Sequence, residues 1–404
     1  MPDHSNRRTR TVLFGAFDRH NFGDLLFPHI VERMLTRRRV LHAGLVTRDL
    51  RAWGGHAVCA FGDLAARSHQ EQLNVIHAGG ELLTCNAWEA AVMLAPPEQV
   101  HAVIAEEDQW RRDPLAWART KFGTASRAPY VISADSFPQV RVQDIALHAV
   151  GGAGLDQREP AFRNEVIDKI RHASHISVRD RQTQAQLRAA GIDAPLVPDS
   201  AVMVAELFGD EIRARAAHGE VQSVLHAFPR GYVALQFDAT FGYDATLDAL
   251  AHQIRRTAKT EGLGIVMFRA GAAPWHDDLD VYRRLDTLLY GIPFHLFLSL
   301  NLWDICALIA HARVYCGGSL HGRIVAMAFA RPRVNLVPMN GAQHTLKQAA
   351  FAATWEPQHI AATTDVDGVA DAIGAALQTD ATLMRDTAAG LACRYRDAFE
   401  ESGL

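Results

Sequence analysis

The stretch Val314–Val334, VYCGGSLHGRIVAMAFARPRV, joins a short apolar run to a small-residue segment with helical spacing through the polar sequence GGSLHGR. We predict a strand, a turn at the two glycines, and a helix that begins near Ser319. Open α/β sheets bind their ligands at such junctions, beyond the carboxyl ends of the strands. His321 and Arg323 are therefore candidate functional residues.

The same alternation of short apolar runs and helix-period segments extends through most of the chain. It begins with the apolar run TVLFGAF at residues 11–17, which a long helical segment follows. Such alternation is typical of parallel sheets flanked by helices. In the second half we predict strands separated by helices at 243–260, 277–290 and 302–311, and terminal helices at 366–378 and 381–399.

The length of 404 residues favours two domains, because a single hydrophobic core rarely grows to that size. The segment 209–230 is polar and weakly periodic, and we interpret it as an inter-domain connection. We therefore predict an α/β fold of two Rossmann-like doubly wound domains facing a cleft, residues 1–208 and 231–404, the second ending in terminal helices. One large sheet with an insertion is the alternative.

Charge and cysteine content exclude several classes of protein. A net charge of -4 gives no general attraction to nucleic acid or to an anionic membrane. The 5 cysteines are scattered without a C-x-x-C pair, which argues against a disulfide framework or a zinc knuckle and fits a reducing cytoplasm. The N-terminal sequence MPDHSNRRTR lacks an apolar signal region, and no apolar stretch approaches the roughly 20 residues of a membrane span. We expect a cytoplasmic protein.

Polar residues follow the first predicted strand. Asn21, Gly23 and Asp24 come directly before a helical segment, and we expect Asp24 to cap that helix. Gly23 would permit a tight turn or the close approach of a ligand. A glycine turn with a helix cap and no ligand explains the pattern equally well. The spacing from Gly15 to Gly23 does not fit the dinucleotide-binding G-x-G-x-x-G pattern.

Two further strand ends carry candidate anion ligands. Gly79 and Gly80 precede a predicted helix start, where aligned backbone dipoles favour an anion, and the adjoining glutamate suits a sugar hydroxyl. Arg179 ends a strand and Arg181 opens a helix. A guanidinium group matches a carboxylate or a phosphate, although a surface ion pair is an equally common role.

The second half adds histidine and carboxylate candidates. His276, Asp277 and Asp278 lie at a predicted helix start. Helix capping explains them better than metal ligation, because successive residues rarely point at one centre, and substrate contact by His276 comes second. The positive end of a helix dipole favours neutral imidazole at His321, which suits proton transfer. A capping or core histidine is the alternative.

Six of these segments, taken in order, resemble the polysaccharide pyruvyl transferase family. They are NFGDLL, GGELL, SVRD, PDSA, HDD and SLHG with RPRV behind it, and they span residues 12–337. The resemblance implies two Rossmann domains of the GT-B type and transfer of a pyruvyl group from phosphoenolpyruvate to two sugar hydroxyls, which leaves a cyclic ketal and free phosphate. It places the family's catalytic histidine on His321 and the arginine of its S-x-R-D motif on Arg179. The family often has arginine where this chain has Ser319.

The residues and the resemblance together predict a site without a metal or other cofactor. We predict that His321 transfers the proton and that Arg179 is the main ligand of the donor anion. Charged groups and helix starts would hold phosphoenolpyruvate. The further candidates are Arg181, Ser319, Gly322, Arg323, Gly79 and Gly80 for the donor, and Asn21, Asp24, Glu81, Asp199, His276 and Asp277 for the acceptor or the cleft.

Two other functions stay open. A glycosyltransferase that uses a nucleotide sugar would need a carboxylate to bind the ribose, for which Asp277 and Asp278 are candidates. A non-catalytic, carbohydrate-binding relative of the enzyme family would explain why this chain has Ser319 where the family often has arginine. In the main interpretation the partners are a small-molecule donor and a carbohydrate acceptor, which can be lipid-linked and would then bring the enzyme to the inner membrane face. We predict no nucleic-acid partner, and the sequence predicts neither the acceptor sugar nor the oligomeric state.

Overall fold

A computed structural model describes residues 10–35, 39–68, 72–338, 345–357, 360 and 363–404. This part of the chain divides into two compact units. Unit 1 contains Phe27–Ser200 with the flanking segments up to His20 and from Asp397 onward. Unit 2 contains Asn21–Leu26 and Ala201–Arg396. Each unit is an α/β structure, so the predicted fold class of two Rossmann-like units is confirmed.

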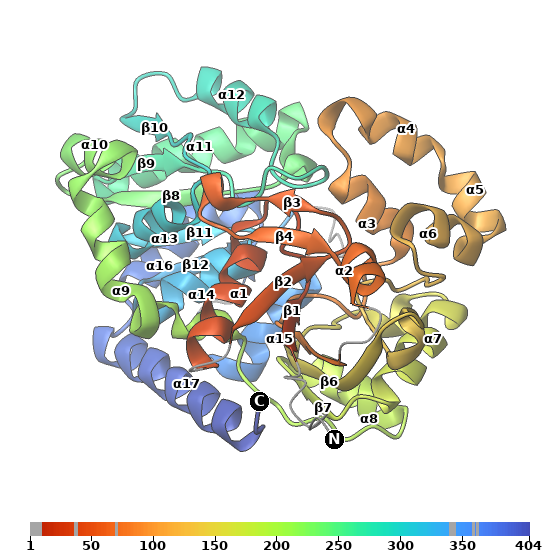
Figure 1. The fold of residues 1–404 in the computed structure, drawn as a ribbon. Helices are drawn as coiled ribbons and strands as arrows, with labels where there is room; N and C mark the ends of the chain where they lie inside the picture. The colour runs from red at the N-terminus through yellow and green to blue at the C-terminus, as the bar shows by residue number, and fades with distance from the viewer. Residues whose placement is uncertain (1–9, 36–38, 69–71, 339–344, 358–359, 361–362) are drawn as a thin grey trace, which may run out of the picture. The chain divides into compact units, whose positions relative to one another are not determined.

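Unit 1 contains a seven-stranded sheet in the order β3-β4-β2-β1-β5-β6-β7 (Figure 1). Its pairs are parallel except for β3 with β4. The apolar residues of β1 are buried, as expected of a parallel strand covered on both faces. The strands are β1 (Arg10–Phe14), β2 (Val40–Gly44), β3 (Arg48–Asp49), β4 (Ala57–Ala60), β5 (Gln72–His77), β6 (Arg141–Val150) and β7 (His175–Val178).

The helices of this half of the chain alternate with the strands except in two places: β2, β3 and β4 follow one another without an α-helix, and a group of helices lies between β5 and β6 (Figure 1). The sequence predicted only the first helix of that group. The helices are α1 (Phe22–Met34), α2 (Phe61–Arg67), α3 (Ala87–Leu94), α4 (Val100–Ala105), α5 (Glu107–Arg112), α6 (Pro114–Phe122), α7 (Pro160–Arg171) and α8 (Arg181–Ala189).

Unit 2 contains a six-stranded, fully parallel sheet in the order β10-β9-β8-β11-β12-β13. This is the 3-2-1-4-5-6 order of the doubly wound dinucleotide-binding fold, so the strand order reverses between β8 and β11. Ligands of such folds bind at the carboxyl ends of the strands beside that switch point. The strands are β8 (Tyr232–Gln236), β9 (Gly264–Met267), β10 (Phe294–Leu296), β11 (Val314–Gly317), β12 (Arg333–Leu336) and β13 (Thr363–Thr364).

The helices predicted at 243–260, 277–290, 302–311, 366–378 and 381–399 correspond to α11, α12, α13, α16 and α17, whereas α10 and α15 were not predicted. No helix in the described part of the chain has the length and apolar character needed to cross a membrane. The helices are α9 (Val204–Ala214), α10 (Gly219–Ala227), α11 (Asp244–Glu261), α12 (Leu279–Leu288), α13 (Leu302–His311), α14 (Leu320–Ala328), α15 (Thr345–Trp355), α16 (Val369–Leu377) and α17 (Ala381–Glu401).

The observed division of the chain differs from the predicted ranges 1–208 and 231–404. Most of the predicted connection, residues 209–230, is helical and forms part of α9 and all of α10. Ile212, Val221 and Val224 are buried within unit 2, whereas the polar residues around them are largely exposed. The many polar positions hide the short apolar faces of these helices, and the segment therefore resembles a linker in sequence.

Candidate functional site

The switch point of unit 2 carries a chain of hydrogen bonds at the carboxyl ends of β8 and β11. Gln236 ends β8, and its Oε1 accepts a hydrogen bond of 2.8 Å from the backbone N–H of Ser319. The Nε2 of Gln236 donates to both carboxylate oxygens of Asp277, at 2.9 Å each. Asp277 thus fixes the orientation of the Gln236 amide, which in turn holds the start of α14. Sequence analysis did not select Gln236, because its role depends on two distant partners.

Ser319 forms the N-cap of α14, so the helix starts where the sequence predicts it. Its side-chain oxygen accepts a hydrogen bond of 3.2 Å from the backbone N–H of Gly322. The Tyr315 hydroxyl donates to the Ser319 carbonyl at 3.0 Å. A Cβ on Gly322 would overlap that tyrosine, so only glycine fits there. The position at which the family often has arginine therefore serves here to begin a helix.

His321 is the second residue of α14 and is buried, with 8% of its surface exposed. Its imidazole packs against the first turn of α1. A Cβ on Gly23 would overlap the ring, and the ring of Phe22 meets it edge-on at a centroid distance of 6.5 Å. The close approach that sequence analysis expected at Gly23 is thus made by the imidazole of His321.

Asn21, rather than Asp24, caps α1. The Oδ1 of Asn21 accepts hydrogen bonds from the backbone N–H groups of Gly23 at 3.1 Å and Asp24 at 3.4 Å. The predicted cap at Asp24 is wrong because the helix begins two residues earlier, at Phe22, which places Asp24 inside the first turn. Asp24 is buried there.

The segment that follows β9 joins the same site. The backbone N–H of Phe22 donates to the carbonyl of Ala270 at 2.8 Å, and Asn21 forms an antiparallel bridge with Gly271. Asp277 accepts a hydrogen bond of 2.5 Å from the backbone N–H of Ala270. Unit 2 therefore brings together three polar segments that are far apart in the sequence: 21–24, 270–277 and 319–322.

His276 and its neighbours line this arrangement. His276 is half-buried, and a Cβ on Gly271 would lie 2.5 Å from the Cδ2 of its ring. Trp275 has a φ of 64°, a left-handed conformation that is rare for a bulky residue and tends to occur at functional sites. Asp278 caps α12 by accepting from the backbone N–H of Asp280, which confirms the capping predicted for this segment.

Burial raises the pKa of Asp277 to about 7, and the hydrogen bonds from Gln236 and Ala270 oppose that shift. The carboxyl group therefore changes charge close to neutral pH. Since both bonds are donated to the carboxylate, protonation of Asp277 would weaken the link through Gln236 to the start of α14.

Arg269 supplies a cation in unit 2 that the predicted set did not include. It follows β9, just before Ala270, and its side chain is half-buried. Within the described ranges its Nε is buried without a hydrogen-bond partner, and its guanidinium forms no ion pair. A buried guanidinium nitrogen in that state is suited to binding an anion.

In unit 1, Arg179 lies between two carboxylates. Its Nη2 is 2.5 Å from Oε2 of Glu81, and its Nη1 is 2.8 Å from Oδ2 of Asp199. Burial disfavours the charged guanidinium, but the two carboxylates outweigh burial and raise the pKa of Arg179. The group as a whole carries one excess negative charge, which makes Arg179 by itself a poor ligand for a donor anion. Its predicted role as the main donor ligand is not supported by this geometry.

Gly79 and Gly80 are not at a helix start. Both have positive φ angles, 113° and 94°, and α3 begins only at Ala87. The predicted helix start is wrong because Asn86 forms a capping box with Glu89, which delays the helix. The two glycines instead let the chain turn tightly after β5.

Arg323 and Arg181 differ in their placement. Arg323 is fully buried, and its guanidinium makes two hydrogen bonds of 2.7 and 2.6 Å to the carboxylate of Glu356. That pairing argues against the predicted role of Arg323 in donor binding. Arg181 is exposed at the first position of α8, directly after Asp180, which caps the helix through the backbone N–H of Thr183.

The two doubly wound units, with polar groups at the carboxyl ends of their strands, define a two-Rossmann α/β protein. The fold is similar to that of UDP-GlcNAc 2-epimerase from Neisseria meningitidis bound to UDP-GlcNAc, with a TM-score of 0.53 and 10% sequence identity over 97% of this chain and 99% of that chain. It is also similar to a protein described as a UDP-N-acetylglucosamine 2-epimerase from Listeria monocytogenes, with a TM-score of 0.52 and 11% identity over 98% of this chain and 93% of that chain.

Sequence comparison gives the family. The family model of polysaccharide pyruvyl transferase matches residues 21–338. No curated protein matches the chain in sequence. The chain belongs to the polysaccharide pyruvyl transferase family, and it is an enzyme of the transferase class.

Proposed function

We propose that this enzyme transfers the pyruvyl group of phosphoenolpyruvate to hydroxyls of a sugar in a polysaccharide or glycoconjugate, forming a pyruvate ketal. The observation that carries the proposal is the convergence of the segments 21–24, 270–277 and 319–322 within unit 2. These segments overlap three of the motifs that resemble the family, and the first of them packs against His321 in the third.

The donor carries a carboxylate and a phosphate, and unit 2 offers groups that favour such anions. Arg269 brings a guanidinium without a carboxylate partner among the described residues. The N-terminus of α14, held by Ser319, adds the positive end of a helix dipole. In this proposal Arg269 takes the role of the arginine that the family often has at the position of Ser319.

His321 carries out the proton transfer. The methylene carbon of the donor accepts a proton, which leaves a cationic carbon that one sugar hydroxyl attacks. The bond to phosphate then breaks, and a second hydroxyl closes the ketal as each hydroxyl gives up its proton. An imidazole that gives and takes these protons contributes about 10²- to 10⁴-fold to the rate. The packing against Gly23 holds the ring in one orientation.

Glu81 is suited to bind hydroxyl groups of the sugar acceptor. Its carboxylate is held by Arg179 and is partly exposed, with 23% of its side chain accessible. A carboxylate in that state accepts hydrogen bonds from sugar hydroxyls. Arg179 then acts as a positioning residue for Glu81.

Calorimetric titration of phosphoenolpyruvate into the full chain tests the donor. We expect saturable binding that weakens about 10- to 100-fold in Arg269→Met, since a charge-assisted hydrogen bond contributes about 1.5–3 kcal/mol. The matched control is Arg283→Met, which removes an exposed arginine of the same unit that pairs with Asp280. If Arg269→Met binds phosphoenolpyruvate as tightly as the wild type, Arg269 is not a ligand of the donor. If the chain binds a nucleotide sugar and does not bind phosphoenolpyruvate, the proposed donor is wrong and the glycosyltransferase alternative is supported.

A second experiment tests His321. With an acceptor on which the wild type is active, we expect His321→Ala to lose about 10²- to 10⁴-fold of its rate of phosphate release. Its affinity for phosphoenolpyruvate should stay within a few fold of the wild type. Normal turnover in this variant would show that another group transfers the proton.

A further inference from the structure

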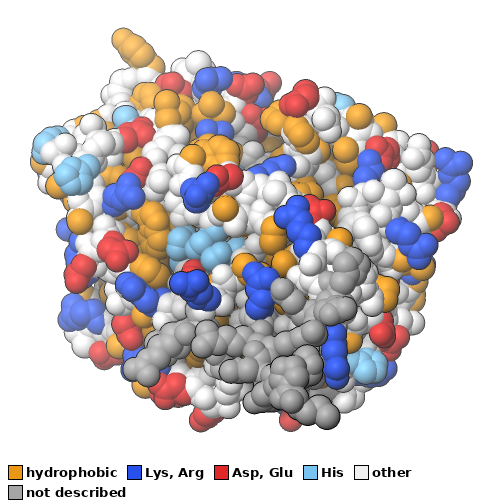
Figure 2. All heavy atoms as spheres, viewed as in Figure 1, with side chains coloured by type: hydrophobic (Ala, Val, Ile, Leu, Met, Phe, Trp, Pro, Cys, Tyr) orange, Lys and Arg blue, Asp and Glu red, His pale blue; other side chains and the backbone are white. Residues whose placement is uncertain are grey.

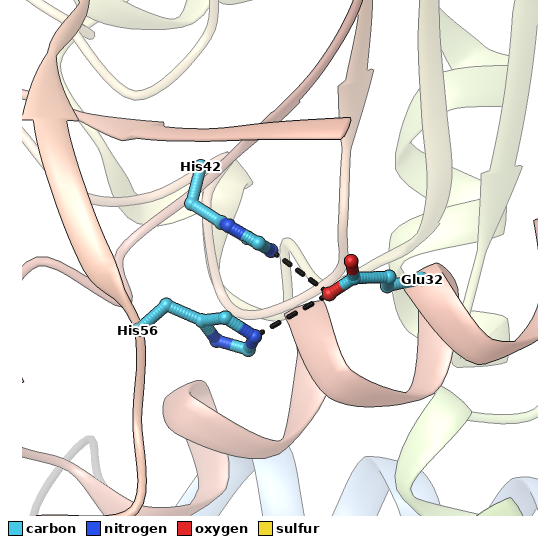
Figure 3. Close-up of side chains that lie close together, drawn as sticks. All are labelled: Glu32, His42 and His56. Atoms are coloured by element: carbon cyan, nitrogen blue, oxygen red, sulfur yellow. Dashed lines mark ion pairs between the residues drawn. The ribbon is translucent and has the colours of Figure 1, made fainter. Parts of the chain in front are cut away.

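A cluster of metal-ligating side chains lies in unit 1, apart from the residues used above (Figure 3). Glu32 comes from α1, His42 from β2, and His56 from the residue before β4. Oε2 of Glu32 is 3.2 Å from Nε2 of His42 and 3.4 Å from Nε2 of His56. The spacing of these residues in the sequence matches no metal-binding motif, so only the fold reveals the cluster.

The two separations between Glu32 and the histidines are those expected between neighbouring ligand atoms of a tetrahedral metal centre. Zinc binds imidazole nitrogen and carboxylate oxygen at about 2.0–2.2 Å, which places neighbouring ligand atoms about 3.3–3.5 Å apart. The Nε2 of His42 is buried and, among the described residues, makes no hydrogen bond despite its short distance to Glu32. If the nitrogen points toward an ion position between the three side chains rather than at the Glu32 oxygen, it lies close to that oxygen without forming a hydrogen bond.

The two imidazoles lie side by side at the cluster. Their rings stack at a centroid distance of 3.8 Å, so one ring rotates about its side-chain bonds when both Nε2 atoms bind one ion. Glu32 is partly exposed, with 42% of its side chain accessible, so an ion can reach the cluster.

The surrounding structure holds the ligands in place. His29, one turn before Glu32 on α1, packs against the ring of His56 at a centroid distance of 4.1 Å and bonds through Nε2 to the Gly54 carbonyl at 2.7 Å. The backbone N–H of Leu50 donates to the carbonyl of His56 at 2.9 Å, which closes the intervening turn. On the face drawn in Figure 2, histidine side chains are visible near the middle and also at the left edge.

We propose that Glu32, His42 and His56 bind one divalent transition-metal ion, with zinc the best match, and that water completes a four-coordinate site. Imidazole with one carboxylate suits zinc, whereas magnesium and calcium prefer oxygen ligands. The ion would join α1, β2 and the turn before β4 in unit 1. It is separate from the proposed transfer chemistry, so its test does not depend on the donor or the acceptor.

Zinc titration of the full chain without a histidine tag tests the site, in the presence of a weak chelator that suppresses binding to scattered surface histidines. We expect one tight equivalent of Zn²⁺ and none of Mg²⁺, together with a rise in the unfolding temperature on zinc addition. Glu32→Gln and His42→Gln should each weaken Zn²⁺ binding by about 100-fold or more and abolish the rise. The control is His172→Gln, which changes an exposed histidine of the same unit.

Cobalt substitution gives a second measurement. Co²⁺ at the same stoichiometry should show the strong visible absorption of a four-coordinate site, and Glu32→Gln should lose it. Glu32 is exposed enough that this variant folds even if a change at His42 disturbs the core. The proposal is overturned if the wild type does not bind zinc under these conditions, or if Glu32→Gln and His42→Gln bind it as tightly as the control.

Discussion

Each unit buries a cluster of three charged side chains, but the two clusters have opposite compositions. Unit 1 holds one arginine between two carboxylates, a carboxylate-rich cluster made of Arg179, Glu81 and Asp199. It lies where strands β5 and β7 end, on the side of the sheet at which doubly wound folds bind ligands. One member, Glu81, is partly open to solvent.

Unit 2 holds one carboxylate between two arginines, an arginine-rich cluster made of Glu356, Arg323 and Arg333. No side chain of this cluster is more than 2% exposed. Burial disfavours the charge on Glu356, but the two guanidinium groups outweigh burial and lower the pKa of its carboxyl group. Arg179 and Arg323 are both buried, so the two clusters differ in the exposure of their carboxylates: Glu81 is accessible to a ligand, whereas Glu356 is not.

The largest effect is expected in the arginine-rich cluster. Glu356→Gln leaves Arg323 and Arg333 buried without a countercharge, and we expect it to lower the free energy of unfolding by about 3–5 kcal/mol. Urea denaturation measures this loss. The control is Asp371→Asn, which removes an exposed partner of Arg256 and should change stability little. A loss no larger than that of the control would show that the cluster does not stabilise unit 2.

The carboxylate-rich cluster should respond less to the same kind of change. In Glu81→Gln, Arg179 keeps its ion pair with Asp199, so we expect a loss of about 1.5–3 kcal/mol in the free energy of unfolding. Affinity for the carbohydrate acceptor should also fall, because a carboxylate accepts hydroxyl hydrogen bonds more strongly than an amide. Glu107→Gln, an exposed residue paired with Arg111, is the control. An unchanged acceptor affinity would show that Glu81 does not bind the acceptor.

The sequence predicted the positions of both arginines but not their partners. Arg179 directly follows β7, and Arg323 lies in the first turn of α14, as the alternation of strands and helices indicates. Glu356 is 33 residues beyond Arg323, in a segment with no recognisable motif, and only the packing around β12 and α14 brings the two together. Charge pairing across such distances is a property of the tertiary fold, so single-sequence patterns do not reveal it.

The fold itself was largely predictable, and the errors have local causes. Parallel strands are buried on both faces, so strands such as β8 and β11 appear as short apolar runs between helices. The start of α3 and the cap of α1 were wrong by a few residues because competing capping residues, Asn86 and Asn21, decide where each helix begins. Gln236 was not selected because nothing in its own segment marks it. Arg269 lies at the end of a predicted strand, but only the fold shows that its Nε is buried without a hydrogen-bond partner among the described residues.

A glycine substitution tests whether the site in unit 2 depends on close packing rather than on ion pairs. In Gly23→Ala the new methyl group would overlap His321, and we expect a loss of about 1–3 kcal/mol in stability, with turnover reduced as the imidazole shifts. Gly390→Ala is the matched control, because that glycine lies inside α17 with open space around it and should gain about 0.5–1 kcal/mol. If both variants gain stability, the imidazole is not fixed by Gly23.

The last comparison concerns the pH dependence that Asp277 gives to unit 2, an effect that is spread over several pH units. Burial raises the pKa of this carboxyl group from 3.8 to about 7, so the folded chain binds its proton more tightly than the unfolded chain. Its contribution to stability is therefore fully present below about pH 4 and is lost as the pH rises to about 7, by at most about 1.4 kcal/mol per pH unit.

Asp277→Asn should lack this loss, so the stability difference between wild type and variant should change steadily across that window, as measured by urea denaturation at several pH values. A constant difference between the wild type and Asp277→Asn from pH 4 to pH 7 would mean that Asp277 stays ionised, bound by Gln236 and Ala270 throughout.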